Sequence, residues 1–162
     1  MTVFVKPMET EADLLGKAYV HWKSWHEAYA GLIPPEYLDG FTLSRCEAIA
    51  RKWQDDLLVA KDGERVIGFC GYGGYRDDSL SDTGEIFSLY VLSPYYGTGV
   101  GAMLMNAALA RLDRYPAVAL WVLGDNGRAI RFYEKQGFIP DGTEQTVSLG
   151  APLREIRMIC RR

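Results

Sequence analysis

Long apolar segments are missing from the 162-residue sequence. The clearest uninterrupted run, residues 117–123, is far shorter than the roughly 20 apolar residues of a membrane-spanning helix. The first seven residues also lack the basic region, apolar block and cleavage site of a secretory signal. We therefore expect a cytoplasmic protein without a membrane partner.

Cysteine and histidine are scarce. The three cysteines, Cys46, Cys70 and Cys160, are isolated and form no CxxC pair, and only His21 and His26 could assist them as ligands. A structural zinc site needs closely spaced ligands, so we expect no metal. Unpaired cysteines of this kind are typical of reduced thiols in a cytoplasmic protein.

A strong excess of one charge is also absent. The chain has 18 basic and 21 acidic residues, a net charge of −3. Because nucleic-acid binding needs a basic surface, we expect no nucleic-acid partner. With 48% hydrophobic and 24% charged residues the composition is that of a folded protein. The length fits one domain over residues 1–162.

Short apolar segments separated by glycine and proline predict alternating strands and helices. Thr10 with Asp13 predicts the start of one helix, and Ser44 with Glu47 the start of another. The predicted strands are 2–6, 57–60, 65–72, 85–92, 117–123, 143–149 and 153–160. The predicted helices are 10–29, a short one from Pro35, 44–53, 99–114, and one from Asp125 or Asn126 to Gly137. This order predicts a mixed sheet with helices on its faces.

The most informative segment is the glycine-rich stretch 95–102, between a predicted strand and a predicted helix. Three glycines within five residues leave the backbone open to a ligand. The following helix start offers unpaired N–H groups and partial positive charge, which together bind phosphate. A turn without any ligand is the alternative interpretation.

Two phosphate-binding interpretations compete at this loop. Gly97, Gly99 and Ala102 fit the dinucleotide fingerprint G-x-G-x-x-G/A, which would indicate a nicotinamide-dependent oxidoreductase. Only about 40 residues remain after the following strand, too few for the second half of a dinucleotide-binding domain. A P-loop is excluded because no Lys-Ser/Thr pair follows the glycines.

Three blocks of sequence together resemble the GNAT superfamily of N-acetyltransferases. Residues 85–94 (EIFSLYVLSP) are similar to its central strand, and residues 96–101 (YGTGVG) to its pyrophosphate loop, Q/R-x-x-G-x-G/A. Residues 125–138 (DNGRAIRFYEKQGF) are similar to its helix motif N-x-x-A-x-x-F-Y-x-x-x-G-F. The resemblance implies an α/β (α+β) fold, with a mixed, mostly antiparallel sheet of about seven strands flanked by about four helices.

One departure from the family pattern concerns the loop start, where Tyr96 replaces the usual Gln or Arg. An Arg there would place a positive charge near the phosphates. We therefore expect binding to depend more on the backbone N–H groups of residues 97–102, and to be weaker.

By this resemblance the cofactor is acetyl-CoA, used as co-substrate. The implied cofactor-binding residues are Leu89, Tyr90, Val91, Tyr96, Gly97, Thr98, Gly99, Val100, Gly101, Ala102 and Asn126. The backbone of Leu89, Tyr90 and Val91 would pair with the pantetheine arm and hold the acetyl oxygen. Asn126 would orient the cofactor or cap its helix.

Acetyl transfer to an amine sets two proton tasks. Deprotonating an amine with a pKa of about 10.4 costs roughly 4–5 kcal/mol at pH 7, so a base is useful. The leaving thiolate needs a proton, and the resemblance makes Tyr133 the candidate acid. Glu85 is the candidate base, directly or through a water. The alternatives are a core tyrosine and a solvated strand-end carboxylate.

The sequence gives fewer indications of which residues bind the acceptor. Trp22, Trp25, His26 and Tyr29 fall on one face of the first long helix and are the candidates for the acceptor pocket. A core stripe is the alternative, and His26 is an alternative base. A further acidic group, before the central strand, would steer a cationic amine or form a solvated turn; it comprises Asp77, Asp78 and Asp82.

We therefore predict an acetyl-CoA-dependent N-acetyltransferase that acts on a primary amine of a small molecule or peptide by direct attack on the thioester. The alternative is a non-catalytic acyl-CoA sensor of the same fold. The identity of the acceptor stays open, as does a homodimer formed through the last two strands.

Overall fold

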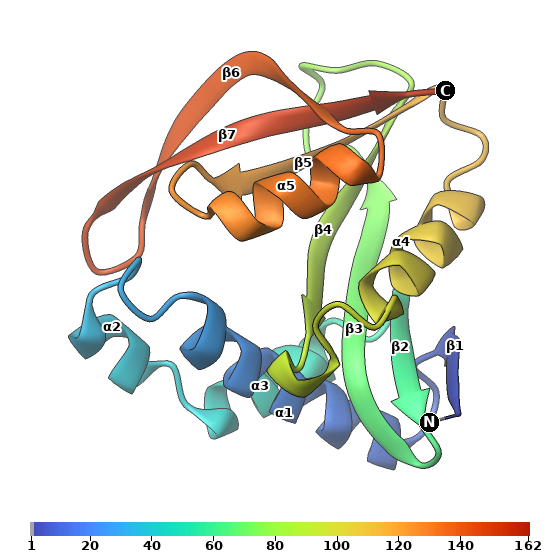
Figure 1. The fold of residues 1–162 in the computed structure, drawn as a ribbon, viewed down its shortest axis with the longest axis vertical. Helices are drawn as coiled ribbons and strands as arrows, with labels where there is room; N and C mark the ends of the chain where they lie inside the picture. Colours follow the sequence, from blue (N-terminus) through green and yellow to red (C-terminus); the bar gives the residue numbers. More distant parts are fainter. Residues whose placement is uncertain (1) are drawn as a thin grey trace.

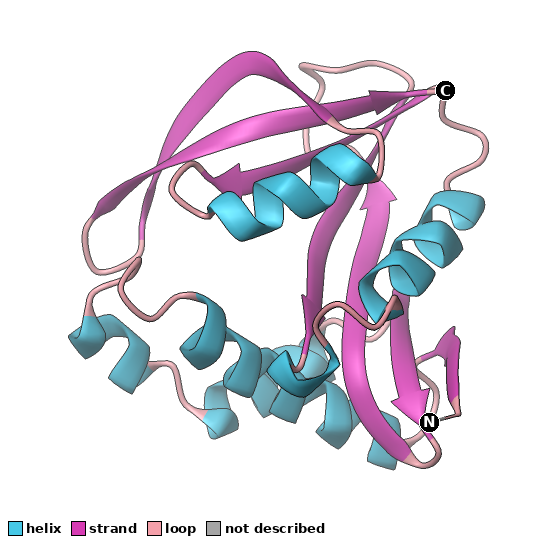
Figure 2. Cartoon of the chain, viewed as in Figure 1, coloured by secondary structure: helices cyan, strands magenta, loops and turns pink. Residues whose placement is uncertain are grey.

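The computed structural model describes residues 2–162, whose strands form one seven-stranded sheet in the order β1-β2-β3-β4-β5-β7-β6 (Figures 1 and 2). All neighbouring strands are antiparallel except β4 and β5, which are parallel. The mixed, mostly antiparallel sheet expected from the resemblance is thus confirmed. The strands are β1 (Val3–Pro7), β2 (Leu57–Asp62), β3 (Arg65–Gly74), β4 (Thr83–Val91), β5 (Ala117–Leu123), β6 (Ile139–Ser148) and β7 (Pro152–Arg161).

Five α-helices and one short 3₁₀ helix connect the strands within residues 2–162. They are α1 (Glu11–Ala28), α2 (Pro35–Gly40), α3 (Leu43–Lys52), the 3₁₀ helix η1 (Ser93–Tyr95), α4 (Val100–Arg111) and α5 (Gly127–Lys135). The resemblance implied about four helices, whereas the residue patterns predicted all five, including the short one that begins at Pro35.

Side-chain caps define where the helices begin. Thr10 and Asp13 form the predicted capping box of α1. The prediction that Ser44 starts α3 was wrong by two residues: the cap is Thr42, whose side chain accepts the backbone N–H of Arg45 at 3.1 Å. Of the two alternatives for α5, the cap is Asn126.

Buried charge holds the start of α1 against the sheet. The Asp13 carboxylate, fully buried, accepts hydrogen bonds from Lys6 of β1 and from Lys61 of β2, the latter at 2.9 Å. Burial alone would raise the pKa of this carboxyl, but the lysines and the backbone N–H groups of Glu9 and Thr10 hold it well below its usual range. The network ties α1 to two strands at once.

Helices α1 and α4 cover opposite faces of β3. A side chain at Gly68 would lie 3.1 Å from Leu104 of α4. The neighbouring Phe69 instead lies beneath Lys17 of α1, whose ammonium is 4.6 Å from the centre of the Phe69 ring. Because successive side chains of a strand point to opposite faces, the sheet separates the α1 side from the α4 side.

Strands β4 and β5 separate soon after they begin. Their parallel pairing is limited to Thr83–Glu85 against Ala117–Ala119, although β4 continues to Val91 and β5 to Leu123 (Figure 1). Beyond Glu85, the edge of β4 that faces β5 therefore lacks a strand partner. We call the space between these diverging parts of β4 and β5 the gap. The candidate site is built around it.

Candidate active site

The peptide groups along the gap alternate in direction. Leu92 donates its N–H to the carbonyl of Ile67 in β3 at 2.9 Å. Since peptide groups alternate sides along a strand, Leu89 and Val91 present their N–H and C=O groups to the gap. The peptide group of Tyr90 faces β3, so only the side chain of this residue is available to the site. An extended ligand arm could pair with β4 here as an added strand.

The glycine loop follows β4 and η1 and leads into α4. Gly97 and Gly99 have φ angles of +75° and +92°, which other residues rarely adopt, and Gly99 is the N-cap of α4. A side chain at either position would meet no atom within 4 Å, so their backbone faces open space. Gly101 has another role: its Cβ would lie 3.1 Å from the Phe132 ring of α5, so this glycine lets α4 and α5 pack closely.

The loop, the end of β4 and α5 enclose a cavity of about 390 Å³, here named the cofactor cavity. Most of the predicted cofactor residues line it, namely Leu89, Tyr90, Val91, Tyr96, Gly97, Gly99, Gly101 and Ala102. Thr98 does not: its hydroxyl donates to the carbonyl of Tyr95. Val100 is buried in the core, so only its backbone could reach a ligand. Asn126 caps α5 by accepting the N–H of Ala129 and lines a neighbouring cavity.

Arg128 supplies a positive charge that the sequence reasoning had not placed at the loop. Its guanidinium lies over the Tyr96 ring, 3.8 Å from the ring centre, and the residue lines the cofactor cavity. A guanidinium stacked on an aromatic ring keeps its N–H donors free at the edges. The charge missing at position 96 is thus present next to it, from α5. The sequence indicates this position only weakly, because Arg128 lies in the first turn of the helix that Asn126 caps.

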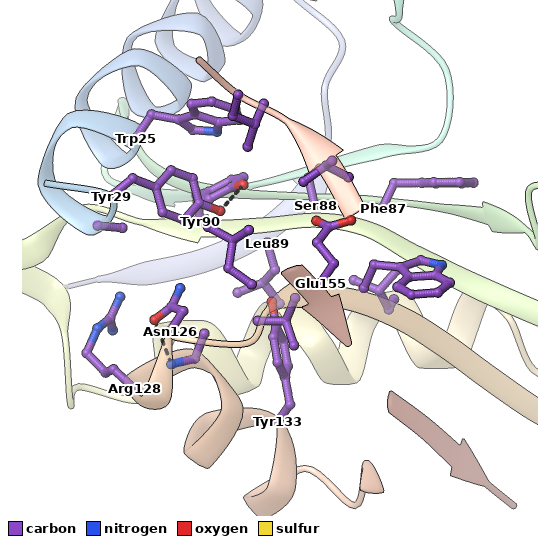
Figure 3. A pocket seen from close by; sticks show the side chains of 18 of the residues that line it. Trp25, Tyr29, Phe87, Ser88, Leu89, Tyr90, Asn126, Arg128, Tyr133 and Glu155 are labelled. Carbon is purple, nitrogen blue, oxygen red and sulfur yellow. Dashed lines mark hydrogen bonds between the residues drawn. The ribbon is translucent and has the colours of Figure 1, made fainter. Parts of the chain in front are cut away.

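A second cavity, of about 270 Å³, is named the acceptor cavity and lies between the end of α1, the gap and the β6–β7 hairpin (Figure 3). Trp25 of α1 and Tyr29, the C-cap of this helix, form one wall, where the hydroxyls of Tyr29 and Tyr90 lie 2.8 Å apart. Glu155 of β7 lines the same cavity, as does Ser88 of β4.

Tyr133 of α5 lies where the two cavities meet. It lines both of them, together with Ala28, Leu89, Tyr90, Arg128 and Ala129. In Figure 3 its side chain extends toward Leu89, one of the residues whose peptide group faces the gap. Burial raises the pKa of the Tyr133 hydroxyl well above its ordinary value, because the phenolate would lose its hydration. The hydroxyl therefore carries its proton at neutral pH.

The aromatic stripe of α1 divides between site and core. Trp25 and Tyr29 line the acceptor cavity. Trp22 packs beside the buried cluster between α1 and α3, and the Nε2 of His26 is 3.0 Å from the carbonyl oxygen of Phe41. Neither Trp22 nor His26 lines the acceptor cavity, because both lie on the side of α1 that faces α3.

Glu85 is buried rather than exposed at the end of its strand. Its carboxylate, 0% accessible, accepts hydrogen bonds from the backbone N–H and the guanidinium of Arg76. Glu85 does not line the acceptor cavity, whereas Arg76 does. The neighbouring acidic residues Asp77, Asp78 and Asp82 are exposed, and Asp77 accepts the N–H of Ser79 in a turn.

Glu155 is the carboxylate that the sequence reasoning missed. It lies in β7 between Arg154 and Ile156 and accepts a hydrogen bond from the Gln145 amide of β6 at 2.8 Å. The charged residues of this strand gave no signal that singled out Glu155. The direction of its side chain depends on the β5–β7 and β6–β7 registers, which local patterns do not specify.

Within residues 2–162, no group of three or more His, Cys, Asp or Glu side chains is arranged to hold a metal ion. Across the same residues, no helix combines the length and the apolar character needed to cross a membrane.

Comparison with known proteins agrees with this geometry. The Acetyltransferase (GNAT) family matches residues 20–138. An uncharacterized N-acetyltransferase of Mycobacterium bovis is 39% identical over 99 residues, and the match spans 59% of this chain and 59% of that relative. The chain thus covers less than two thirds of the relative's length.

Two solved structures share the fold. The PaiA N-acetyltransferase of Thermoplasma acidophilum, in complex with coenzyme A, has a TM-score of 0.76 at 20% identity and full coverage of both chains. YncA of Salmonella typhimurium, solved with acetyl-CoA, has a TM-score of 0.72 at 19% identity, covering 99% of this chain and 94% of that one.

The fold is therefore that of these two solved acetyltransferase structures. The chain belongs to the GNAT family of acetyltransferases, as its three sequence blocks had indicated.

The Arg76–Glu85 pair leads to a stability prediction. We expect Arg76→Met to lower the free energy of unfolding by about 2 kcal/mol, because the buried Glu85 carboxylate loses its charged partner and keeps only the backbone N–H of residue 76. Partial exposure of Arg76 reduces the full penalty. Adding Glu85→Gln should recover part of this loss. Urea denaturation measures both, and a double variant less stable than Arg76→Met would contradict the pairing.

Proposed function

We propose that this protein is an N-acetyltransferase that moves an acetyl group from acetyl-CoA to a primary amine of a small molecule or peptide, within a single domain over residues 1–162. The observation that carries the proposal is the position of Tyr133, a buried protonated hydroxyl shared by the two cavities. One cavity suits the donor and the other the acceptor. The cytoplasmic location stays a prediction, supported by the free cysteines.

The residues present fit coenzyme A. The open backbone at Gly97 and Gly99, the N-terminus of α4 and the Arg128 guanidinium offer N–H donors and positive charge for the pyrophosphate. The unpaired edge of β4 at Leu89 and Val91 offers peptide groups for the pantetheine arm. When bound, acetyl-CoA supplies a thioester, an activated acyl group.

Glu155 is the base we favour for the incoming amine. Its carboxylate lines the acceptor cavity and can accept a proton from the bound ammonium, which releases the neutral amine for attack on the thioester. Glu85, the base expected from the sequence, has its oxygens engaged by Arg76. We assign Glu85 a positioning role, in which it holds Arg76 at the wall of the acceptor cavity.

Tyr133 acts at the other end of the transfer. Its hydroxyl gives its proton to the sulfur as the C–S bond breaks, so the products are a neutral amide and a free thiol. The N–H groups of Leu89 and Val91 that face the gap are the candidates to stabilise the oxyanion.

Thiol release tests the enzyme against a non-catalytic sensor. The protein is incubated with acetyl-CoA and a panel of primary amines, and the free thiol is followed. We expect amine-dependent release. Coenzyme A binding without release for any amine supports the sensor instead, and binding of NADH without coenzyme A would exclude both.

Tyr133→Phe should lower kcat about 100-fold, because the leaving thiolate loses its proton donor. Coenzyme A affinity should change by less than about threefold, since the ring remains in place. Steady-state kinetics and calorimetry measure the two quantities. Tyr19→Phe, at an exposed position of α1, is the matched control. An unchanged kcat in Tyr133→Phe would remove the acid assignment.

Glu155→Gln should lower kcat/KM for the amine about 100-fold at pH 7. The loss should shrink as pH rises, because the unprotonated fraction of the amine grows about tenfold per pH unit below its pKa. A pH series with Glu144→Gln as the exposed control on β6 measures this. A loss that is the same at every pH argues for a purely structural Glu155.

Arg128→Gln should weaken coenzyme A binding about tenfold, the equivalent of one charge-assisted hydrogen bond of about 1.4 kcal/mol. The difference from wild type should diminish in high salt, because the interaction is ionic and accessible to solvent. Calorimetry at two salt concentrations measures it, with Arg131→Gln on the same helix as control. Equal affinity in both proteins would mean that the loop needs no added charge.

A further inference from the structure

A larger cavity, of about 700 Å³, lies where α1 and the end of α3 approach β3 and β4, and is named the lysine cavity. Several aromatic rings form part of its walls, and a lysine and a histidine of α1 line it. The residues that matter here are Lys17, His21, Trp53, Phe69, Phe87 and Ser88.

Lys17 is a buried cation without an anion. The residue is 3% exposed, and its ammonium lies over the Phe69 ring. No carboxylate in residues 2–162 lies within salt-bridge distance of it. Burial lowers the pKa of Lys17 to about 8, which still leaves the amine mostly protonated at pH 7.

Within the described part of the chain, the other buried charged residues each have a partner of opposite charge, which Lys17 lacks. Asp13 is held by Lys6 and Lys61, and Glu85 by Arg76. A buried charge is costly unless it is paired, so an unpaired one that faces a cavity indicates an opposite charge brought by a ligand.

His21 adds a second unsatisfied group to the same wall. Its Nδ1 is buried and has no hydrogen-bond partner among residues 2–162. Burial lowers the pKa of the imidazole to about 3, so the ring is neutral and can donate one hydrogen bond. Lys52, Asp55 and Asp56 also line the cavity, but they are exposed and screened by water.

The lysine cavity adjoins the acceptor cavity. Phe87 and Ser88 of β4 line both. The Phe69 ring beneath Lys17 is 5.5 Å from the ring of Tyr90, which lines the acceptor and cofactor cavities. One ligand can therefore place an amine near Glu155 and an anionic group near Lys17, with an apolar body along the aromatic walls between them.

We propose that the lysine cavity is a specificity subsite in which Lys17, assisted by His21, binds a carboxylate of the acceptor. The acceptor class is then an amine that carries a carboxylate at the far end of an apolar chain. This inference rests on the proposed acetyltransferase function and narrows its substrate.

Matched acceptors test the subsite. The kcat/KM of an ω-amino acid, ω-aminohexanoate, is compared with that of hexylamine, and the series is repeated with shorter and longer chains. In wild type the amino acid of the best length should be favoured at least tenfold. Lys17→Met should bring the ratio to about one, and Lys17→Arg should keep most of it. Lys23→Met on the same helix should leave the ratio unchanged.

A binding readout keeps the test independent of turnover. Hexanoate, which has no amine, should raise the thermal unfolding midpoint of wild type and of Lys23→Met, but not of Lys17→Met. If Lys17→Met does not fold, Lys17→Gln takes its place. The proposal is overturned if Lys17→Met keeps the wild-type ratio of kcat/KM values. It is also overturned if Lys17→Arg lowers this ratio as much as Lys17→Met does. Absent thiol release with every amine, while hexanoate still stabilises wild type, counts against the proposed function and not against the subsite.

Discussion

The short parallel pairing of β4 and β5 is the constraint on which the site depends. After three residue pairs the two strands separate, and the edge of β4 at Leu89 and Val91 is left without a strand partner. Buried peptide groups need hydrogen-bond partners, so such an edge is suited to an extended ligand or to water. The same separation lets Tyr133 reach the region between the cofactor and acceptor cavities. Each later feature of the proposed chemistry uses this opening.

The backbone geometry around the glycine loop and α5 was largely predictable because its determinants are local in sequence. Positive φ angles at Gly97 and Gly99 and the cap at Asn126 follow from residue types that favour those conformations. The strand at 117–123 was evident as an apolar run. One local error, the start of α3, arose because Thr42 competes with Ser44 as a cap and lies two residues earlier. Another was the start of β6, at Ile139 rather than residue 143.

The acceptor side was less predictable because its determinants are distant in sequence. Glu155 faces the cavity only through the register of β7 with its neighbours. Trp22 and Trp25 both pack against the buried cluster between α1 and α3, but only Trp25 also lines the acceptor cavity, which a helical period cannot reveal. Nothing in the sequence distinguishes Lys17 from a surface lysine, because its burial depends on how α1 packs in the assembled fold. Burial and pairing are properties of the assembled fold, so sequence patterns did not distinguish these side chains.

The close contact at Gly101 has a mechanical consequence. Because Phe132 of α5 rests directly on this glycine, the helix that begins at the glycine loop and the helix that carries Tyr133 form one rigid wall. A larger residue at position 101 would push the two helices apart and shift Tyr133 together with the glycine loop. Under the proposed function, this one contact therefore positions both the loop that binds the donor and the hydroxyl that protonates the leaving thiolate.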